Sequence, residues 1–313
     1  MDPATIKFRK MDPLFADCNA GPEDARYVFF GVPFDASVSH LSGAALAPPR
    51  MRKESYNFET FLMDLEVELE EVPMHDAGDL VLENSLDGQK LVQTSTQAFF
   101  GSILRDGKFP LMMGGDHSIS VASANAFMEQ YSGKRGIVLV IDAHLDFRDQ
   151  YLDNPLSHAC FSRRVLEKWG KDSIAIIGVR SGCAEEFRDA RDKGLNFFSS
   201  RFVHYRGILD ALNSLNDAIA IKERPIYLSI DIDGIDPAYA PGTGTPEPWG
   251  LTTWDVLHLM QEIRTNVRAM DVMEVSPTVE EYITPGLASK MLRQMVGFKE
   301  MEEKGSTWLE KMF

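Results

Sequence analysis

The chain has 313 residues, of which 44% are hydrophobic and 25% charged, a balance typical of a folded globular protein and unlike that of a disordered one. Its 32 Lys and Arg against 47 Asp and Glu give a net charge of -15. This charge disfavours nucleic acid and anionic membranes as partners and suits a small cationic substrate. We expect a cytoplasmic protein, because the sequence shows no signal peptide, no membrane-spanning stretch and no paired spacing of its 3 cysteines.

Eight short apolar runs predict strands that are buried on both faces. In chain order they are 26–32, 72–75, 110–115, 136–142, 173–179, 195–198, 225–232 and 268–275, of which 72–75 and 195–198 are the weaker members. Segments with helical periodicity lie between them, at 88–105, 119–130, 204–221, 253–265 and 285–299. Strands and helices therefore alternate along the chain.

This alternation indicates an α/β fold, because parallel strands joined by crossover helices give a mostly parallel sheet with helices on both faces. No linker, internal repeat or low-complexity tract divides the chain, so we expect one domain over residues 1–313. Ligands of such sheets bind beyond the carboxyl ends of the strands. The residues that follow each apolar run are therefore the candidates for a functional site.

Three of these strand ends carry clustered histidine and aspartate. They supply His117 in MMGGDHSIS, Asp142, His144 and Asp146 in DAHLD, and Asp231 and Asp233 in SIDIDGIDP. Residues two apart in an extended chain project from one side, so each group can direct its polar atoms at one point. Clustered carboxylates at an apolar strand end require a cation to neutralise them. Two imidazoles and four carboxylates favour Mn²⁺ or a similar divalent ion, and six ligands favour two ions over one.

The motifs GGDHS, DAHLD, SIDIDGIDPAYAPGTGTPEP and DVMEVSP, with GVPFD (31–35) and IGVRS (177–181), resemble the ureohydrolase family of arginases and agmatinases. The agmatinase branch is the closer match. The resemblance implies a three-layer α/β/α fold around a mostly parallel sheet of about eight strands. It also implies two Mn²⁺ per chain and a homo-oligomer, a trimer or a hexamer.

By this resemblance, His117, Asp142, Asp146 and Asp231 hold one ion, and His144, Asp142, Asp231 and Asp233 hold the other. A hydroxide that bridges the two ions is then the nucleophile, because coordination lowers the pKa of water. The resemblance also implies that Asp146 hydrogen-bonds this hydroxide and passes its proton to the leaving amine. His158, in NPLSHAC, matches the proton-shuttle histidine of the family.

The resemblance further implies that Glu274 binds the substrate guanidinium, a planar donor fork that suits a carboxylate. Thr245 and Glu247 occupy positions where the family lines its entrance. With two divalent ions, a hydroxide and every carboxylate ionised, about two negative charges remain for a dication such as agmatine to balance. The expected reaction is hydrolysis of agmatine to putrescine and urea.

Some positions depart from the family pattern. The stretch FRDQYLDNPLSH lacks the Asn- and Ser-rich motif with which arginases bind the carboxylate of arginine, which disfavours arginine as the substrate. Arg148 adds a cation after DAHLD, and if it faces the pocket, a guanidino acid such as guanidinobutyrate or guanidinopropionate becomes an alternative. Trp249 stands where the family usually has Gly, and it could narrow the mouth of the site or lie at a subunit contact.

Two other classes remain open from the sequence. A deacetylase-like or formimino-type hydrolase keeps the fold but changes the chemistry, and a one-metal deacetylase would need only one Asp/His/Asp set. A non-catalytic homologue would have lost a metal ligand or Glu274, and the sequence retains all of them.

Overall fold

The computed structural model describes residues 1–2 and 5–303. Its strands are β1 (Phe8–Arg9), β2 (Tyr27–Gly31), β3 (Phe61–Leu62), β4 (Val67–Glu68), β5 (Met74–Leu80), β6 (Phe109–Met113), β7 (Ile137–Ile141), β8 (Ile174–Val179), β9 (Asn196–Ser199), β10 (Ile226–Asp231) and β11 (Val267–Met273). Its α-helices are α1 (Ala47–Ser55), α2 (Gln89–Arg105), α3 (Ser120–Gln130), α4 (Phe161–Trp169), α5 (Ala184–Asp192), α6 (Ser200–Arg206), α7 (Ile208–Ile219), α8 (Thr253–Ile263) and α9 (Ile283–Glu303).

Nine of the strands in the described residues form one sheet, in the order β1-β5-β2-β6-β11-β10-β7-β8-β9. All neighbours in this sheet are parallel except β1, which pairs antiparallel with β5. The eight predicted strands are all present in this sheet, and the two-residue edge strand β1 is its one addition among the described residues. The short strands β3 and β4, which were not predicted either, form a separate two-stranded sheet. The expected α/β fold with a mostly parallel sheet is confirmed.

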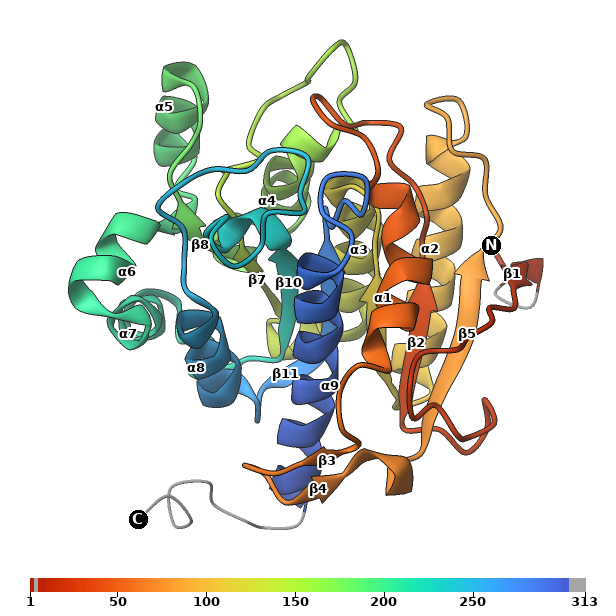
Figure 1. Ribbon diagram of the computed structural model, residues 1–313. Coiled ribbons are helices and arrows are strands. Elements are labelled where there is room, and N and C mark those ends of the chain that lie inside the picture. Colours follow the sequence, from red (N-terminus) through yellow and green to blue (C-terminus); the bar gives the residue numbers. More distant parts are fainter. Residues whose placement is uncertain (3–4, 304–313) are drawn as a thin grey trace.

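Helices cover both faces of the sheet (Figure 1). Alternate residues of β7 show the two layers: Ile137, Leu139 and Ile141 pack in one core with side chains of α1, α7, α8 and α9, whereas Val138 and Val140 pack in another with side chains of α2, α3 and α4. Because side chains of a strand alternate between its faces, a run of β-branched and aliphatic residues can fill both cores. This explains why the central strands read as continuous apolar runs.

The helix predicted over 204–221 is divided in the structure. α6 ends at Arg206 and α7 begins at Ile208, with Gly207 between them at φ 89°. A backbone with this positive φ cannot continue a right-handed helix, and glycine adopts it without the steric cost of a Cβ. The two short helices therefore change direction at this residue.

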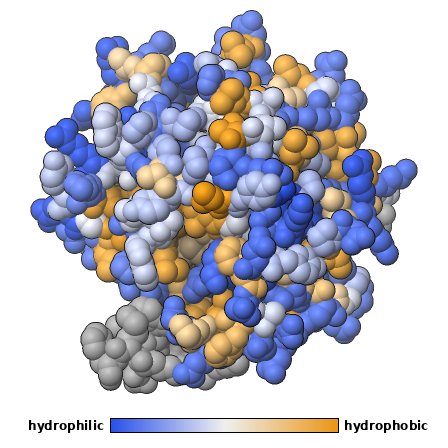
Figure 2. Space-filling view, in the orientation of Figure 1, coloured by the Kyte–Doolittle hydropathy of each residue, from blue (hydrophilic) through white to orange (hydrophobic). Residues whose placement is uncertain are grey.

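Among the described residues, no helix is long and apolar enough to cross a membrane. Hydrophilic side chains cover much of the face shown in Figure 2, and the hydrophobic ones between them gather in separate patches.

Candidate metal centre

The candidate site lies beyond the carboxyl ends of four strands that are neighbours in the sheet. β6, β11, β10 and β7 lie side by side, and they are followed or ended by the polar residues His117, Glu274, Asp231 and Asp142, respectively. Parallel strands bring all their carboxyl ends to one edge of the sheet. Residues far apart in the sequence therefore meet in one place.

The turn that carries His117 is possible because of Gly115. A Cβ atom at this position would lie 1.8 Å from the carbonyl oxygen of Phe34, so only glycine lets the two backbones approach so closely. The amide of Glu274 donates to the carbonyl of Gly115 at 2.9 Å, which joins the ends of β6 and β11. His117 and Glu274 are thereby fixed next to each other.

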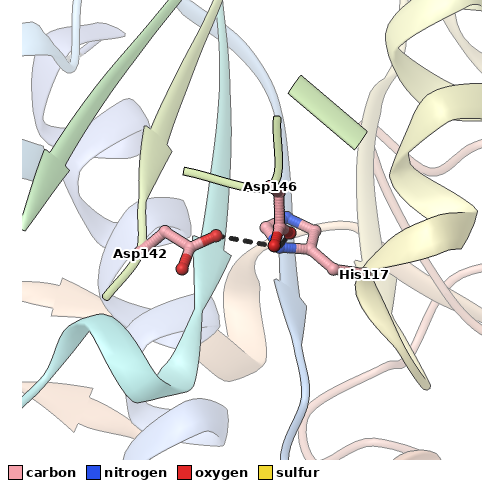
Figure 3. A group of neighbouring side chains, drawn as sticks. All are labelled: His117, Asp142 and Asp146. Carbon is pink, nitrogen blue, oxygen red and sulfur yellow. Dashed lines mark ion pairs between the residues drawn. The ribbon is translucent and has the colours of Figure 1, made fainter. Parts of the chain in front are cut away.

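Four of the predicted residues form what we call the inner cluster: His117, Asp142, Asp146 and Asp231. The Nδ1 atom of His117 lies 3.1 Å from Asp231 Oδ2, 3.4 Å from Asp142 Oδ2 and 3.6 Å from Asp146 Oδ2. Figure 3 shows the carboxylates of Asp142 and Asp146 directed toward the imidazole ring. All four residues are buried.

The remaining predicted ligands form the outer cluster: His144 and Asp233, with Asp142 shared between the two clusters. His144 Nδ1 lies 3.1 Å from Asp233 Oδ2 and 3.6 Å from Asp142 Oδ1. The side chain of His144 is 25% exposed, whereas those of Asp142 and Asp233 are almost completely buried. The structure therefore brings together all six residues that the sequence singled out as metal ligands.

The atoms of the inner cluster fit a bound cation. In the described part of the chain, His117 Nδ1 and Asp142 Oδ2 are buried and have no hydrogen-bond partner, a costly state for buried polar atoms. On the other side of the ring, Nε2 of His117 lies 3.0 Å from the hydroxyl of Ser229. If Nε2 carries the proton and donates it there, Nδ1 presents a lone pair toward the three carboxylates.

The pKa shifts that the protein side chains cause by themselves also favour a bound cation. Burial raises the pKa of Asp146 and of Asp231 well above the usual range, and the neighbouring carboxylates raise them further. Burial alone would lower the pKa of His117, but the carboxylates of Asp142 and Asp231 outweigh it and raise the pKa. Without metal, the clusters would therefore hold protons, and divalent ions would displace them.

A buried network supports His117 from behind. Ser229 of β10 is paired in register with Asp271 of β11, a fully buried carboxylate. Asp271 Oδ2 accepts from Ser120 Oγ at 2.7 Å and from the hydroxyl of Tyr227. Asp271 was not among the residues predicted from the sequence, although a carboxylate in the middle of an otherwise apolar strand was a signal that could have found it.

Glu274 lies beside the inner cluster with its backbone at φ 61°, and Asp146 has a similarly positive φ of 47°. Such conformations are unfavourable for residues other than glycine and persist where the surroundings impose them, which is often at functional sites. Glu274 Oε1 accepts from the amide of His117 at 2.8 Å. Burial raises the pKa of Glu274 well above its usual range, and the charge of Asp231 adds to the shift.

His158 lies in the wall of the same cavity. Its Nδ1 is 2.7 Å from the carbonyl oxygen of Ser37, so Nδ1 carries the proton and donates it. Nε2 is then the free base, 3.3 Å from the hydroxyl of Ser39. Burial lowers the pKa of His158 below its ordinary value. The loop that carries Ser37 and Ser39 was not among the predicted site residues, because its contacts with His158 cross more than a hundred residues of sequence.

The cavity has a volume of about 370 Å³. It is lined by Ser39, His144, Asp146, Arg148, Tyr151, His158, Ala159, Ser181, Gly182, Cys183, Glu186, Asp231, Asp233, Thr245 and Glu274. Arg148 therefore faces the pocket, the condition on which the guanidino acid alternative depends. Thr245 also lines it, and its hydroxyl donates to Asp233 Oδ2 at 2.9 Å.

Two other predicted positions lie outside this lining. Glu247 Oε1 is 3.9 Å from His144 Nε2, at the edge of the outer cluster. Trp249 is 85% exposed and borders a separate hollow with Tyr205 of α6, so its indole does not narrow the cavity of the two clusters.

The sequence matches the arginase family over residues 25–297. The chain belongs to the arginase family. An agmatinase of Bacillus anthracis is 35% identical over 293 residues, which cover 90% of this chain and 95% of that protein. An N(1)-aminopropylagmatine ureohydrolase of Thermococcus kodakarensis is 33% identical over 279 residues, 88% of this chain and 91% of that one.

Among solved structures, the agmatine ureohydrolase of Thermoplasma volcanium is 34% identical, with a TM-score of 0.86 over 94% of this chain and 96% of that chain. The proclavaminate amidino hydrolase of Streptomyces clavuligerus is 27% identical, with a TM-score of 0.81 over 94% and 98%. These likenesses confirm the resemblance to ureohydrolases, the arginase-like fold and the expectation of a hydrolase.

Proposed function

We propose that this arginase-family protein is a binuclear manganese ureohydrolase that converts agmatine and water to putrescine and urea. Manganese is proposed because the six candidate ligands offer two imidazoles and four carboxylates without a thiolate, a set that suits Mn²⁺ better than a structural zinc ion. When bound, two divalent ions supply a hydroxide nucleophile near neutral pH, because they lower the pKa of water.

The observation that carries the substrate proposal is the carboxylate of Glu274. It is buried at the cavity, next to the inner cluster, and it has no cationic side chain as an ion-pair partner in the described residues. A guanidinium is planar and offers paired N–H donors to such a carboxylate. Glu274 would thus orient the guanidinium carbon toward the metal centre.

Two other side chains would transfer the proton that the reaction moves to the leaving amine. Asp146 would accept it beside the inner cluster and pass it to the leaving amine. His158 presents an unprotonated Nε2 to the cavity, and with its pKa lowered by burial it remains a base near neutral pH. It would exchange the proton between the cavity and solvent.

The alternative guanidino substrates differ from agmatine at the end of the molecule that is far from the guanidinium. Arginine is disfavoured by the missing carboxylate-binding motif, whereas Arg148 in the cavity wall keeps guanidinobutyrate and guanidinopropionate as candidates. A formimino-type amidine would use the same metal centre. We also propose a single domain over residues 1–313, of which 3–4 and 304–313 lie outside the described residues, and a cytoplasmic homo-oligomer, a trimer or a hexamer.

The test is urea release by the manganese-loaded protein from agmatine, arginine, guanidinobutyrate and guanidinopropionate, with metal content measured in parallel. We expect two manganese ions per chain and the highest kcat/KM for agmatine. Equal inactivity on all four compounds, in protein that contains both ions, would contradict the proposal and favour an amidine hydrolase or a non-catalytic role.

A further inference from the structure

Asp116 stands next to the candidate ligand His117 but belongs to neither cluster, and its carboxylate is fully buried. Its Oδ2 accepts from the amide and the hydroxyl of Ser37 at 2.9 and 2.8 Å. Its Oδ1 accepts from the amide of Ser118 at 3.1 Å and from the hydroxyl of the same residue. A buried carboxylate needs such donors, because burial without them is costly. Asp116 therefore ties the loop at Ser37 to the turn that carries His117.

Ser37 passes this support on to His158 through two atoms. Its hydroxyl, whose proton goes to Asp116, accepts from the amide of His158 at 3.0 Å. Its carbonyl oxygen accepts from Nδ1 of the His158 ring at 2.7 Å. The carboxylate, the serine and the histidine thus form one chain of contacts, although they come from three separate segments of the sequence. The position of the carbonyl that faces the ring depends on the bonds that Asp116 makes.

The ring of His158 has weaker polar contacts elsewhere. Ser157 Oγ lies 3.4 Å from Nδ1, and Ser39 Oγ lies 3.3 Å from Nε2, both at the long end of hydrogen-bond distances. A neutral imidazole carries one proton, and the nitrogen with the better acceptor keeps it. If the carbonyl of Ser37 moved away, the proton would be free to settle on Nε2 and to bond Ser39. The nitrogen proposed as the free base would then lose its lone pair.

We propose that Asp116 is a positioning residue for His158. Acting through Ser37, it keeps the ring proton on Nδ1 and leaves the lone pair of Nε2 for proton transfer. The effect on turnover rests on the proposed function, whereas the state of the ring can be observed without any turnover. Because Asp116 is fully buried, it acts on His158 and makes no contact with substrate.

Three truncations separate this role from a general effect on the fold. Asp116→Ala removes the acceptor of all four bonds. Ser37→Ala removes one hydroxyl between Asp116 and His158 but keeps the backbone amide and carbonyl. Ser118→Ala is the matched control, because it removes a hydroxyl that bonds the other oxygen of the same carboxylate and leaves the contacts of Ser37 in place. Each protein is loaded with manganese, and its metal content is measured.

For Asp116→Ala we expect kcat for agmatine to fall roughly ten- to a hundredfold, a large part of what one proton-transfer group contributes. KM should stay within about twofold of the wild type, since neither Glu274 nor the clusters change. Ser37→Ala should lose less of kcat in the same way, and Ser118→Ala should stay within about twofold of the wild type. If Asp116→Ala lost an ion or failed to fold, the comparison of the two serine variants would decide. Equal losses in those two variants would overturn the inference.

The tautomer of His158 gives a second readout that does not depend on turnover. Protein with ¹⁵N-labelled histidine, loaded with diamagnetic Zn²⁺ in place of Mn²⁺, is compared at pH 8 with His158→Gln to identify the two ring nitrogens. The ¹⁵N chemical shifts should show a protonated Nδ1 in the wild type and in Ser118→Ala, and a mixture of both tautomers in Asp116→Ala. An unprotonated Nδ1 in the wild type, or an unchanged ring in both Asp116→Ala and Ser37→Ala, would contradict the inference. If the wild type released no urea, the proposed function would fail and these spectra would still decide.

Discussion

The inner and outer clusters share Asp142 but differ in their surroundings. His117 is fully buried, and its Nε2 lies 3.0 Å from the hydroxyl of Ser229, which is paired in register with the buried Asp271. His144 is partly exposed, and the residue next to its Nε2 is the half-exposed Glu247. Since hydrogen bonds behind a ligand orient it and raise its metal affinity, we infer that the inner cluster holds its ion more tightly and that the outer ion exchanges more readily.

Residues that would hold metal are also distinct from residues that would hold substrate. Glu274 lies against the inner cluster and accepts from the amide of His117, yet it is not one of the six candidate ligands of the two clusters. A carboxylate in this place would bind substrate without contributing to the metal sites. That distinction leads to the largest expected effect.

Replacing Glu274 by Gln should abolish turnover while both ions stay bound. The variant keeps the size and the acceptor for the His117 amide but loses the charge that a buried guanidinium needs. We expect kcat/KM for agmatine to fall by at least about a thousandfold, or about 4 kcal/mol. Urea release and metal content per chain are the measurements. Retained activity would show that Glu274 has another role, and loss of an ion would assign it to the inner cluster.

A matched pair of variants tests the difference in metal affinity. Asp271→Asn removes the buried charge beside Ser229, the hydroxyl partner of His117, and Thr245→Val removes the hydroxyl that donates to Asp233. Replacing a residue that supports a metal ligand typically lowers metal affinity, so each change should lower the affinity for one ion by roughly ten- to a hundredfold. The measurement is titration of metal-free protein with Mn²⁺, followed by electron paramagnetic resonance. Asp271→Asn should lower the affinity of the tighter binding phase, and Thr245→Val should lower the affinity of the weaker one. If each variant lowered the affinity of both phases equally, the two clusters would not bind their ions independently.

The smallest expected effect concerns His158 at the cavity wall. Burial lowers its pKa in the folded protein, so between that pKa and the ordinary value of about 6.5 the unfolded chain binds more protons than the folded one. Its contribution to stability is therefore constant above pH 6.5 and declines as the pH falls below it.

Metal-free wild type and His158→Gln, unfolded with urea at pH 7.5 and pH 5.5, provide the measurement. The wild type should lose stability relative to the variant on acidification, by up to about 1.4 kcal/mol per pH unit. A relative gain would mean that the buried ring is protonated in the fold, and that Nε2 is not the free base.

Much of the architecture was predictable because its signal is local. The eight strands are continuous apolar runs, and the six candidate ligands follow them at spacings that direct polar atoms to one side. The division of 204–221 was missed because its periodicity continues across Gly207, whereas a single backbone conformation breaks the helix there. The edge strand β1 has only two residues, too few for any alternation to appear.

The supporting residues of the site were not predictable, because their meaning depends on contacts between distant segments. Asp271 lies beside Ser229, the hydroxyl partner of His117, and Ser37 fixes the ring of His158 from 121 residues away. In the sequence, Glu186 is one of several charged residues on a polar helix, and only the fold places it beside Phe147. A motif shows which polar atoms could bind a ligand, but only the tertiary structure shows which of them already have a hydrogen-bond partner in the protein.

The order of the central strands has a consequence for biosynthesis. β6 and β7 are synthesised one after the other, yet β11 and β10, made last, are inserted between them in the sheet. A nascent chain that has emerged only as far as Asp146 carries four of the candidate ligands, but the strands that bear them cannot yet stand at their final separation. Metal uptake should thus mark the completion of the sheet, and a ribosome-bound chain lacking its last strands should compete poorly for manganese.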